Sequence, residues 1–310
     1  MILSIVIPCY NCSSNVFKLL DIIRQQVNEE TKNKIEVILV NDGSSDNTEE
    51  ILYSFVAKYN TFNSTIITTP NNGAAMAREL GLKKATGRYV FFCDSDDLIS
   101  RDFIDVFLKT YYKHDDFDIL YFSSVQSMSG DVDSSNRSSK ISFSTEGIED
   151  EPSVFFNYLL NKGMWTAAVW TYIFRRELAT IGNANFTNRA AHEDHLFTLK
   201  ILFSSKKIIY TDAVLYMQMI TEGSLTNSNK NTSYINDRYS AYKEASSYLI
   251  PRCDASTCEK YNNWSVSSIL RLYKENNFAL LNALLDLSFF RFFLNELNII
   301  KSIIFKRHLR

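Results

Sequence analysis

Strand-like runs alternate with helix-like segments through the first 125 residues, and this alternation constrains the fold more than any other feature. The expected strands, most of them rich in apolar residues, are 3–8, 35–40, 64–69, 88–93 and 118–124. Between them apolar residues recur every three or four positions, which indicates helices. Strands that are apolar on both faces are typical of a mostly parallel sheet covered by helices on both sides. The sequence therefore predicts an α/β fold with a Rossmann-like sheet.

Polar turns follow the first, second and fourth expected strands. In such sheets ligands bind beyond the carboxyl ends of the strands. The Gly-rich GxGxxG fingerprint of dinucleotide-binding proteins is absent. We therefore expect a ligand site at this edge of the sheet, but one that does not depend on a GxGxxG motif.

The rest of the chain changes in character. The Ser-rich and charged stretch 126–145 predicts a long loop, and a helix is expected near 151–161. A strand followed by a helix start is expected within 165–178, a helix over 192–203, and two short strands within 206–219. From residue 233 onward the pattern is helical. We expect a division into 1–125, 126–226 and a helical C-terminal extension, 227–310.

Charge and cysteine content exclude several classes of protein. The formal net charge of −2 gives no global basic field for nucleic acid. Five scattered Cys residues do not suggest a secreted disulfide framework. No run approaches the roughly 20 apolar residues of a membrane span, and the N-terminus lacks the features of a signal peptide. We expect a cytoplasmic protein without a transmembrane helix, and leave its oligomeric state open.

The C-terminal segment carries an apolar stripe and a basic end. The stripe consists of Phe289, Phe293, Leu297, Ile300 and Ile304. No acidic residue follows Glu296, whereas Lys301, Lys306, Arg307 and Arg310 are basic. This pattern is typical of a helix that lies in an anionic membrane interface. The alternative is a helix packed on the rest of the domain.

Two acidic clusters lie on the expected ligand-binding edge. Asp94, Asp96 and Asp97 directly follow an apolar strand, and closely spaced carboxylates there suit Mg²⁺ or Mn²⁺. The alternative is that Asp97 or Ser100 caps the next helix. Asp42 and Asp46 follow the second strand, where carboxylates commonly accept hydrogen bonds from ribose hydroxyls or base edges. The alternative there is a set of Asx turns.

Taken together, several motifs resemble one known family. "SIVIPCYN", "ILVNDGSSDNT" and "NNGAAMARELGLKKATGRYVFFCDSDD", in that order and spacing, are similar to the family 2 inverting glycosyltransferases of the GT-A fold. "VWTYIFRREL", "HEDHLF" and "EGSLT" extend the resemblance over about residues 1–226. The resemblance implies a nucleotide-diphosphate sugar donor, a divalent metal ion (Mn²⁺ or Mg²⁺) held by a DxD motif, and a single displacement with inversion.

The resemblance also implies roles for residues near the donor. Pro8, Tyr10 and Asp42 are expected to line the nucleoside pocket, with Asp46 nearby. Arg78 is expected near the base or phosphates, although the next residue is Glu79 where the family usually has Asn.

Further roles follow for the DxD motif and the second acidic site. Asp94 and Ser95 are expected on the nucleotide-sugar side. Asp96 is the expected metal ligand, with Asp94 close to the metal. Asp194 matches the family's catalytic base, and Glu193 and Trp170 are expected in the acceptor or sugar pocket.

The chemistry agrees with two separate acidic sites. An acceptor hydroxyl is a poor nucleophile, so a carboxylate must take its proton during attack. The leaving diphosphate gains negative charge, which a metal ion stabilises. In many relatives basic residues that can reach the diphosphate precede the Gly-Ser turn, but here the segment is "YMQMITEGSLT". Lys230, or a basic residue of the C-terminal helices, is the expected substitute.

We therefore expect a bacterial-type glycosyltransferase of surface-polysaccharide synthesis, UDP-sugars being the favoured donors. Its acceptor would be a glycan, with a polyprenyl-diphosphate-linked one suggested by the C-terminal stripe. The protein would sit peripherally on the cytoplasmic face of the inner membrane. Alternatives are an inactive scaffold of an assembly complex, or a phosphatase or nucleotidyltransferase that uses the same Asp cluster. The "HEDH" and "CYNC" sequences also raise zinc binding and redox chemistry as minor alternatives.

Overall fold

The computed structural model describes residues 1–59, 62–114, 116–127, 137–220, 230–275 and 287–308. All five strands expected in the first 125 residues are present. They are β1 (Leu3–Cys9), β2 (Ile35–Asp42), β3 (Asn63–Thr69), β4 (Tyr89–Phe92) and β6 (Ile119–Ser127). The helices between them are α1 (Val16–Gln26), α2 (Thr48–Lys58), α3 (Ala74–Lys84) and α4 (Phe103–Lys113).

These strands belong to one mixed sheet with the order β3-β2-β1-β4-β9-β6-β10-β5. The pairs β3–β2, β2–β1 and β1–β4 are parallel, and β9 (Tyr172–Arg175) runs antiparallel between β4 and β6. The remaining strands are β5 (Leu98–Ile99), β7 (Arg137–Ile141), β8 (Gly147–Glu149) and β10 (Ile208–Met219). The expected fold class, a mostly parallel Rossmann-like sheet flanked by helices, is confirmed.

The apolar sequence of the central strands is explained by burial on both faces. Alternate residues of a strand point to opposite sides of a sheet. Val6 and Ile38 accordingly join a core on one face, whereas Ile5 and Val37 join a second core on the other. At Gly81 of α3 a Cβ atom would lie 2.2 Å from Cγ1 of Val6, so only Gly allows this close approach of helix and strand. The approach fixes α3, which carries Arg78, against the sheet.

Two expectations outside this region are wrong. Part of the expected loop 126–145 forms β7, which pairs antiparallel with β6, because an edge position lets polar side chains face away from the core. The two short strands expected within 206–219 are the single strand β10, which pairs parallel with β6. Its register with β6 shifts between Thr211 and Tyr216, next to the polar residues Thr211 and Asp212 that suggested two separate strands.

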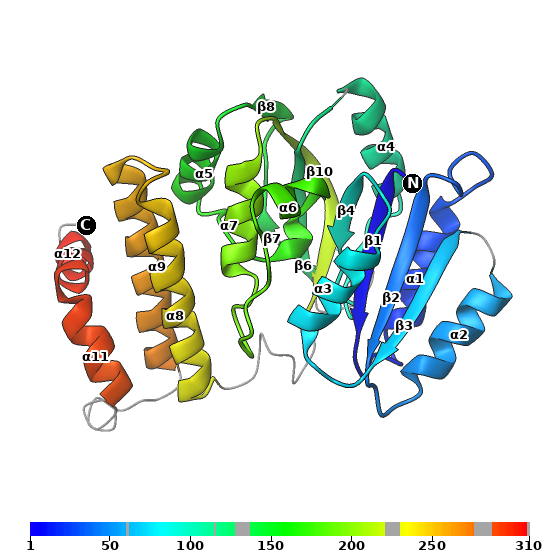
Figure 1. Cartoon of the computed structure of the whole chain (residues 1–310). Helices are drawn as coiled ribbons and strands as arrows, with labels where there is room; N and C mark the ends of the chain where they lie inside the picture. The colour runs from blue at the N-terminus through cyan, green and yellow to red at the C-terminus, as the bar shows by residue number, and fades with distance from the viewer. Residues whose placement is uncertain (60–61, 115, 128–136, 221–229, 276–286, 309–310) are drawn as a thin grey trace.

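Helices form the rest of the chain. They include α5 (Pro152–Asn161), the short helices η1 (Val169–Thr171) and α6 (Glu177–Ile181), and α7 (His195–Ser204). The C-terminal extension contains α8 (Thr232–Leu249), α9 (Ala255–Glu275), α11 (Leu287–Asn295) and α12 (Leu297–His308). Figure 1 shows α8 and α9 between α7 and the outermost pair, α11 and α12.

The C-terminal segment packs through a different face from the stripe expected from the sequence. Phe292, Glu296 and Ile300 are buried, and Glu296 accepts hydrogen bonds from the hydroxyls of Tyr239 and Tyr242, each at 3.1 Å. The amides of Glu296 and Ile300 donate hydrogen bonds to the carbonyl oxygens of Phe292 and Glu296, so these three residues, four positions apart, lie on the one helical face that packs inward. Phe293, Leu294 and Ile304 are exposed, while the side chain of Phe289 lies outside the described residues.

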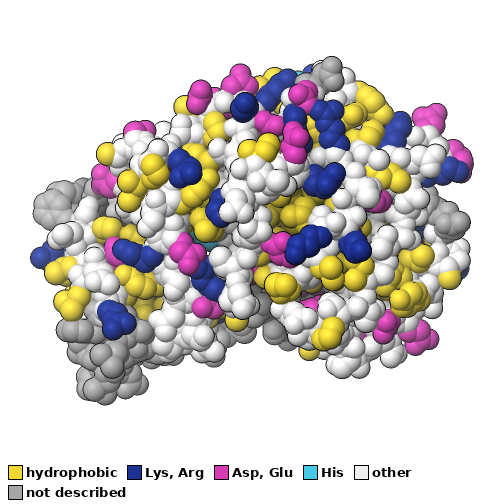
Figure 2. Space-filling model, viewed as in Figure 1, with side chains coloured by type: hydrophobic (Ala, Val, Ile, Leu, Met, Phe, Trp, Pro, Cys, Tyr) yellow, Lys and Arg dark blue, Asp and Glu magenta, His cyan; other side chains and the backbone are white. Residues whose placement is uncertain are grey.

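No helix in the described part of the chain is both long and apolar enough to span a bilayer. Basic and acidic side chains are intermixed over the face shown in Figure 2, without a field of one sign.

Candidate active site

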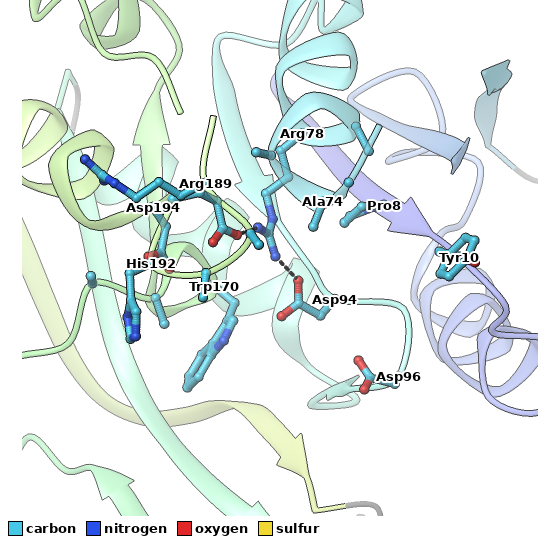
Figure 3. A pocket seen from close by; sticks show the side chains of 18 of the residues that line it. Pro8, Tyr10, Ala74, Arg78, Asp94, Asp96, Trp170, Arg189, His192 and Asp194 are labelled. Atoms are coloured by element: carbon cyan, nitrogen blue, oxygen red, sulfur yellow. Dashed lines mark hydrogen bonds and ion pairs between the residues drawn. The ribbon is translucent and has the colours of Figure 1, made fainter. Parts of the chain in front are cut away.

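A cleft of about 1490 Å³ opens at the carboxyl ends of β1, β2 and β4. It brings together the turns that follow these strands, the loop before α7, and side chains of α8 and α9. Nearly all of the site residues expected from the sequence line it: Pro8, Tyr10, Asp42, Arg78, Asp94, Ser95, Asp96, Trp170, Glu193 and Asp194. Figure 3 shows Tyr10 and Asp96 at one side of Arg78 and Asp194 at the other.

The turn after β1 forms one end of the cleft. Tyr10 is half exposed there, which leaves its ring face available for stacking. Asn11 has a φ of 48°, a left-handed conformation that Asn tolerates better than most residues. Its side-chain oxygen accepts a hydrogen bond from the Ser45 amide at 2.8 Å, which ties the turns after β1 and β2 together.

The two aspartates after β2 differ in their positions. Asp42 is buried in the cleft wall, and its two carboxylate oxygens accept hydrogen bonds from the amides of Asn72 and Gly73 at 2.9 and 2.8 Å. Asp46 does not line the cleft, and it accepts hydrogen bonds from the amides of Ser13 and Thr48. Although burial opposes the shift, these hydrogen bonds lower the pKa of Asp46 to about 2. The Asx-turn alternative thus explains Asp46.

In the acidic cluster after β4, Asp97 has a structural role, whereas Asp96 is free of ion pairs within the described residues. Asp97 is buried and accepts hydrogen bonds from the Tyr216 hydroxyl at 2.6 Å and the Met219 amide at 2.7 Å. The alternative that Asp97 caps the following helix is wrong, because these bonds tie it to β10. Asp96 forms no ion pair within the described residues, and burial followed by the charge of Asp94 raises its pKa.

Arg78 connects the two acidic sites. Its Nη2 pairs with Oδ1 of Asp94 at 2.7 Å and its Nη1 with Oε1 of Glu193 at 2.8 Å. Although burial disfavours the guanidinium charge, Asp94 and Glu193 raise the pKa of Arg78 above its usual value. Glu79, which departs from the family pattern, accepts a hydrogen bond from the Phe186 amide at 2.8 Å and so orders the chain next to this arginine.

Asp194 lies at the start of α7, beside Glu193. Burial, and then the charge of Glu193, raise the pKa of Asp194 to about 8, while Arg78 opposes this rise. His192, just before the pair, has a φ of 58°. A carboxylate whose pKa is raised in this way is a stronger base than a solvated one and suits proton abstraction.

Trp170 forms another part of the wall. Its ring stacks on Tyr216 with a centroid distance of 4.6 Å and an interplanar angle of 7°. Lys140 of β7 lies nearby, with Nζ 2.9 Å from Oε1 of Gln218 and 5.7 Å from the Trp170 ring centroid. Sequence reasoning missed Lys140 because it lies in the stretch taken for a loop.

On the opposite wall Arg189 was missed, whereas Lys230 or a basic residue of the C-terminal helices was expected near the diphosphate. Arg189 and Arg238 line the cleft, as does Lys230, which was expected as a candidate. The "EGSLT" motif lies outside the described residues. Arg238 is a residue of α8, and no motif in the sequence singles it out from the other polar residues of that helix.

A divalent cation fits the donor side of the cleft better than zinc fits the histidines. Mg²⁺ and Mn²⁺ are commonly held by one or two carboxylates plus substrate phosphates, and the carboxylate of Asp96 has no counter-charge of its own. No group of three or more His, Cys, Asp or Glu side chains is placed to hold a metal by itself in the ranges described above. His195 faces the Tyr261 hydroxyl at 2.8 Å, and the five cysteines are free thiols.

The fold and the cleft define an α/β enzyme of the GT-A class, with acidic residues at the carboxyl ends of its strands. The family description "Glycosyl transferase family 2" matches residues 4–173, and the chain belongs to this family. The chain is 27% identical over 238 residues to the uncharacterized glycosyltransferase YibD of Escherichia coli, covering 75% of this chain and 66% of that protein. It is 24% identical over 291 residues to the putative glycosyltransferase EpsH of Bacillus subtilis, covering 88% and 80%.

Solved structures share the fold. S. aureus TarS 1–349 in complex with UDP-GlcNAc has a TM-score of 0.70 and 22% identity, covering 98% of this chain and 82% of that one. The mannosyltransferase PcManGT of Pyrobaculum calidifontis, in complex with GDP-Man and Mn²⁺, has a TM-score of 0.55 and 17% identity, covering 97% and 86%.

Proposed function

We propose that this protein transfers a sugar from a nucleotide-diphosphate sugar to a hydroxyl group of a glycan acceptor, with inversion at the anomeric carbon. Membership of the family supports glycosyl transfer. The observation that carries the proposal is the presence, in one cleft, of the Asp94–Asp96 cluster and Asp194 on opposite sides of Arg78. Inversion needs the base and the leaving group on opposite faces of the sugar, and this arrangement supplies both positions.

The donor is proposed to occupy the side of the cleft formed by β1, β2 and β4. Pro8, Tyr10 and Asp42 would line the nucleoside pocket, with Ser95 and Asp94 next to the ribose and sugar. UDP-sugars are the favoured class. Solved neighbours contain UDP-GlcNAc in one case and GDP-Man with Mn²⁺ in another, which supports a nucleotide-sugar donor in this fold.

The chain's own residues would perform the following tasks. Asp194 takes the proton of the acceptor hydroxyl as its oxygen bonds to the anomeric carbon and the bond to the diphosphate breaks. Arg78 holds Asp94 and Glu193 in fixed positions between the two reacting groups. Trp170 and Glu193 border the sugar. When bound, a divalent cation held by Asp96, with Asp94 beside it, would stabilise the charge of the leaving diphosphate as a Lewis acid.

A binding experiment tests the donor site. Purified protein is titrated with UDP-, GDP- and dTDP-sugars, each with Mn²⁺, with Mg²⁺ and with EDTA, and its melting temperature is followed. A ligand that binds only the native state raises the apparent stability in proportion to occupancy. We expect one nucleotide class to raise the melting temperature only with metal. In the Asp96→Asn variant this effect should disappear, while Asp46→Asn should retain it. Binding that is unaffected by EDTA and by Asp96→Asn would contradict the proposed site.

The acceptor is proposed to be lipid-linked, such as a polyprenyl-diphosphate glycan of surface-polysaccharide synthesis. Phe293, Leu294 and Ile304 are exposed on the outermost helices, where Lys301 adds a positive charge. Exposed apolar side chains with basic neighbours suit an anionic membrane surface. Through them the protein would bind peripherally to the cytoplasmic face of the inner membrane. Residues 1–125 would bind the donor and 126–226 the acceptor, with 227–310 as the helical extension.

A further inference from the structure

Arg238 of α8 is a buried cation that has no counter-ion among the residues the structure describes. Its side chain lines the cleft although the residue is only 2% exposed. Nη2 donates a hydrogen bond to Oγ of Ser265 at 3.3 Å, and the guanidinium carbon lies 5.0 Å from the ring centroid of Trp264. Nη1 has no hydrogen-bond partner, and Arg238 takes part in no ion pair within the described residues. Burying an uncompensated charge is costly, so this arrangement indicates a bound anion.

Other positively charged groups surround Arg238. Arg189, which is paired with Glu244, and Lys230, which lies over the Tyr234 ring, line the same wall. Nε2 of His192 is buried without a hydrogen-bond partner. Burial, and then the charges of Arg238, Arg189 and Lys230, lower the pKa of His192 to about 3, so the ring is neutral and can donate or accept a hydrogen bond. The wall therefore combines a positive field with two unsatisfied polar atoms.

The position of this cluster separates it from the donor. Figure 3 shows His192 and Arg189 on the side of Arg78 where Asp194 lies, away from Asp96 and Tyr10. A donor diphosphate held at Asp96 would lie across the cleft from the cluster. The acceptor must reach Asp194, and the side of Asp194 away from the donor is the space that the cluster borders.

We propose that Arg238, supported by Lys230 and His192, binds an anionic group, a phosphate or a carboxylate, carried by the acceptor. The assignment of the anion to an acceptor rests on the proposed function, whereas anion binding at Arg238 does not. The guanidinium lies over the Trp264 ring and donates to Ser265, and these contacts restrain it. A planar fork of N–H donors suits phosphate and carboxylate oxygens. A neutral acceptor would leave the buried charge unpaired, so the site selects for an acidic acceptor.

The test measures anion binding to the full chain by the shift in melting temperature. The probes are inorganic phosphate, glucose 6-phosphate, glucuronate and glucose, and the second and third distinguish a phosphate from a carboxylate. The variants are Arg238→Met, which keeps the apolar contact with Trp264, and Lys230→Gln. The matched control is Arg252→Met, because Arg252 also lies over an aromatic ring, that of Tyr248, but does not line the cleft.

We expect at least one anionic probe, but not glucose, to raise the melting temperature of the wild type and of Arg252→Met. In Arg238→Met the apparent affinity should fall roughly 10- to 100-fold, as expected for losing charge-assisted hydrogen bonds. Lys230→Gln should show a smaller loss. Without ligand, Arg238→Met should melt no lower than the wild type, because it removes an unpaired buried charge.

Several results would overturn this proposal. One is that no anionic probe shifts the melting temperature, and another is that the shift is unchanged in Arg238→Met. A third is that saturating UDP and Mn²⁺ abolish the wild-type shift, because the anion would then bind at the donor site. If instead no nucleotide sugar binds while the anion effect persists, the proposed function fails and the anion site stands.

Discussion

The pairing of Arg78 with Asp94 and Glu193 gives a prediction that needs no knowledge of donor or acceptor. The three side chains are 9%, 28% and 16% exposed, and the two ion pairs measure 2.7 and 2.8 Å. Replacing one member of a buried ion pair costs about 3–5 kcal/mol, since it leaves the partner's charge uncompensated. Because both carboxylates keep some solvent contact, we expect Arg78→Met to lower the free energy of unfolding by about 3 kcal/mol at pH 7.5, the lower end of that range.

Urea denaturation followed by far-UV circular dichroism measures this change. Arg78→Met combined with Glu193→Gln should recover about half of the loss, as one unpaired charge is removed. The control is Lys109→Met, which breaks an ion pair whose side chains are 75% and 60% exposed, so its effect on stability should be small beside that of Arg78→Met. A loss below about 1 kcal/mol for Arg78→Met would refute the reasoning.

Three further predictions concern other parts of the chain. Burial and the charge of Glu193 raise the pKa of Asp194 to about 8, and a general base acts in its deprotonated form. The turnover number should therefore rise with pH towards about 8 and then level off. A turnover number that does not change with pH would show that Asp194 is not the group that titrates. Asp46→Ala should lower the free energy of unfolding by about 1 kcal/mol, because it removes two hydrogen bonds of the turns, and it should leave the donor affinity unchanged. Weaker donor binding by this variant would instead assign Asp46 to the donor site. Serine at Phe293, Leu294 and Ile304 together should reduce sedimentation with anionic vesicles without lowering the melting temperature, and equal sedimentation of variant and wild type would disprove the membrane contact.

The arrangement of the sheet could be predicted because the relevant signals are local. β2 and β4 are buried along their whole length, so most of their residues are apolar. The turns that follow β1, β2 and β4 then carry the polar residues to one edge. Asp94, Asp96 and Asp42 line the cleft for this reason, and no long-range information was needed to place them there.

The remaining features depend on contacts between distant segments. Arg78 pairs with Glu193, 115 residues away, and Asp97 accepts a hydrogen bond from Tyr216, 119 residues away. No local pattern distinguishes Asp97 from a helix cap. β7 forms a strand because it pairs with β6, and its Ser-rich sequence has no apolar pattern that would predict this. The face of the last helices that packs inward was likewise decided by the pocket that Tyr239 and Tyr242 form for Glu296.

The central claim is that one acidic site binds the donor and another takes the proton. It is tested most directly by comparing wild type and Asp194→Asn for two quantities, the dissociation constant of the donor by calorimetry and the rate of nucleotide diphosphate release. We predict a dissociation constant within about twofold of the wild type and a rate reduced by about 10²- to 10⁴-fold, the usual contribution of a general base. Equal losses of affinity and rate, or an unchanged rate, would contradict this assignment of the two sites.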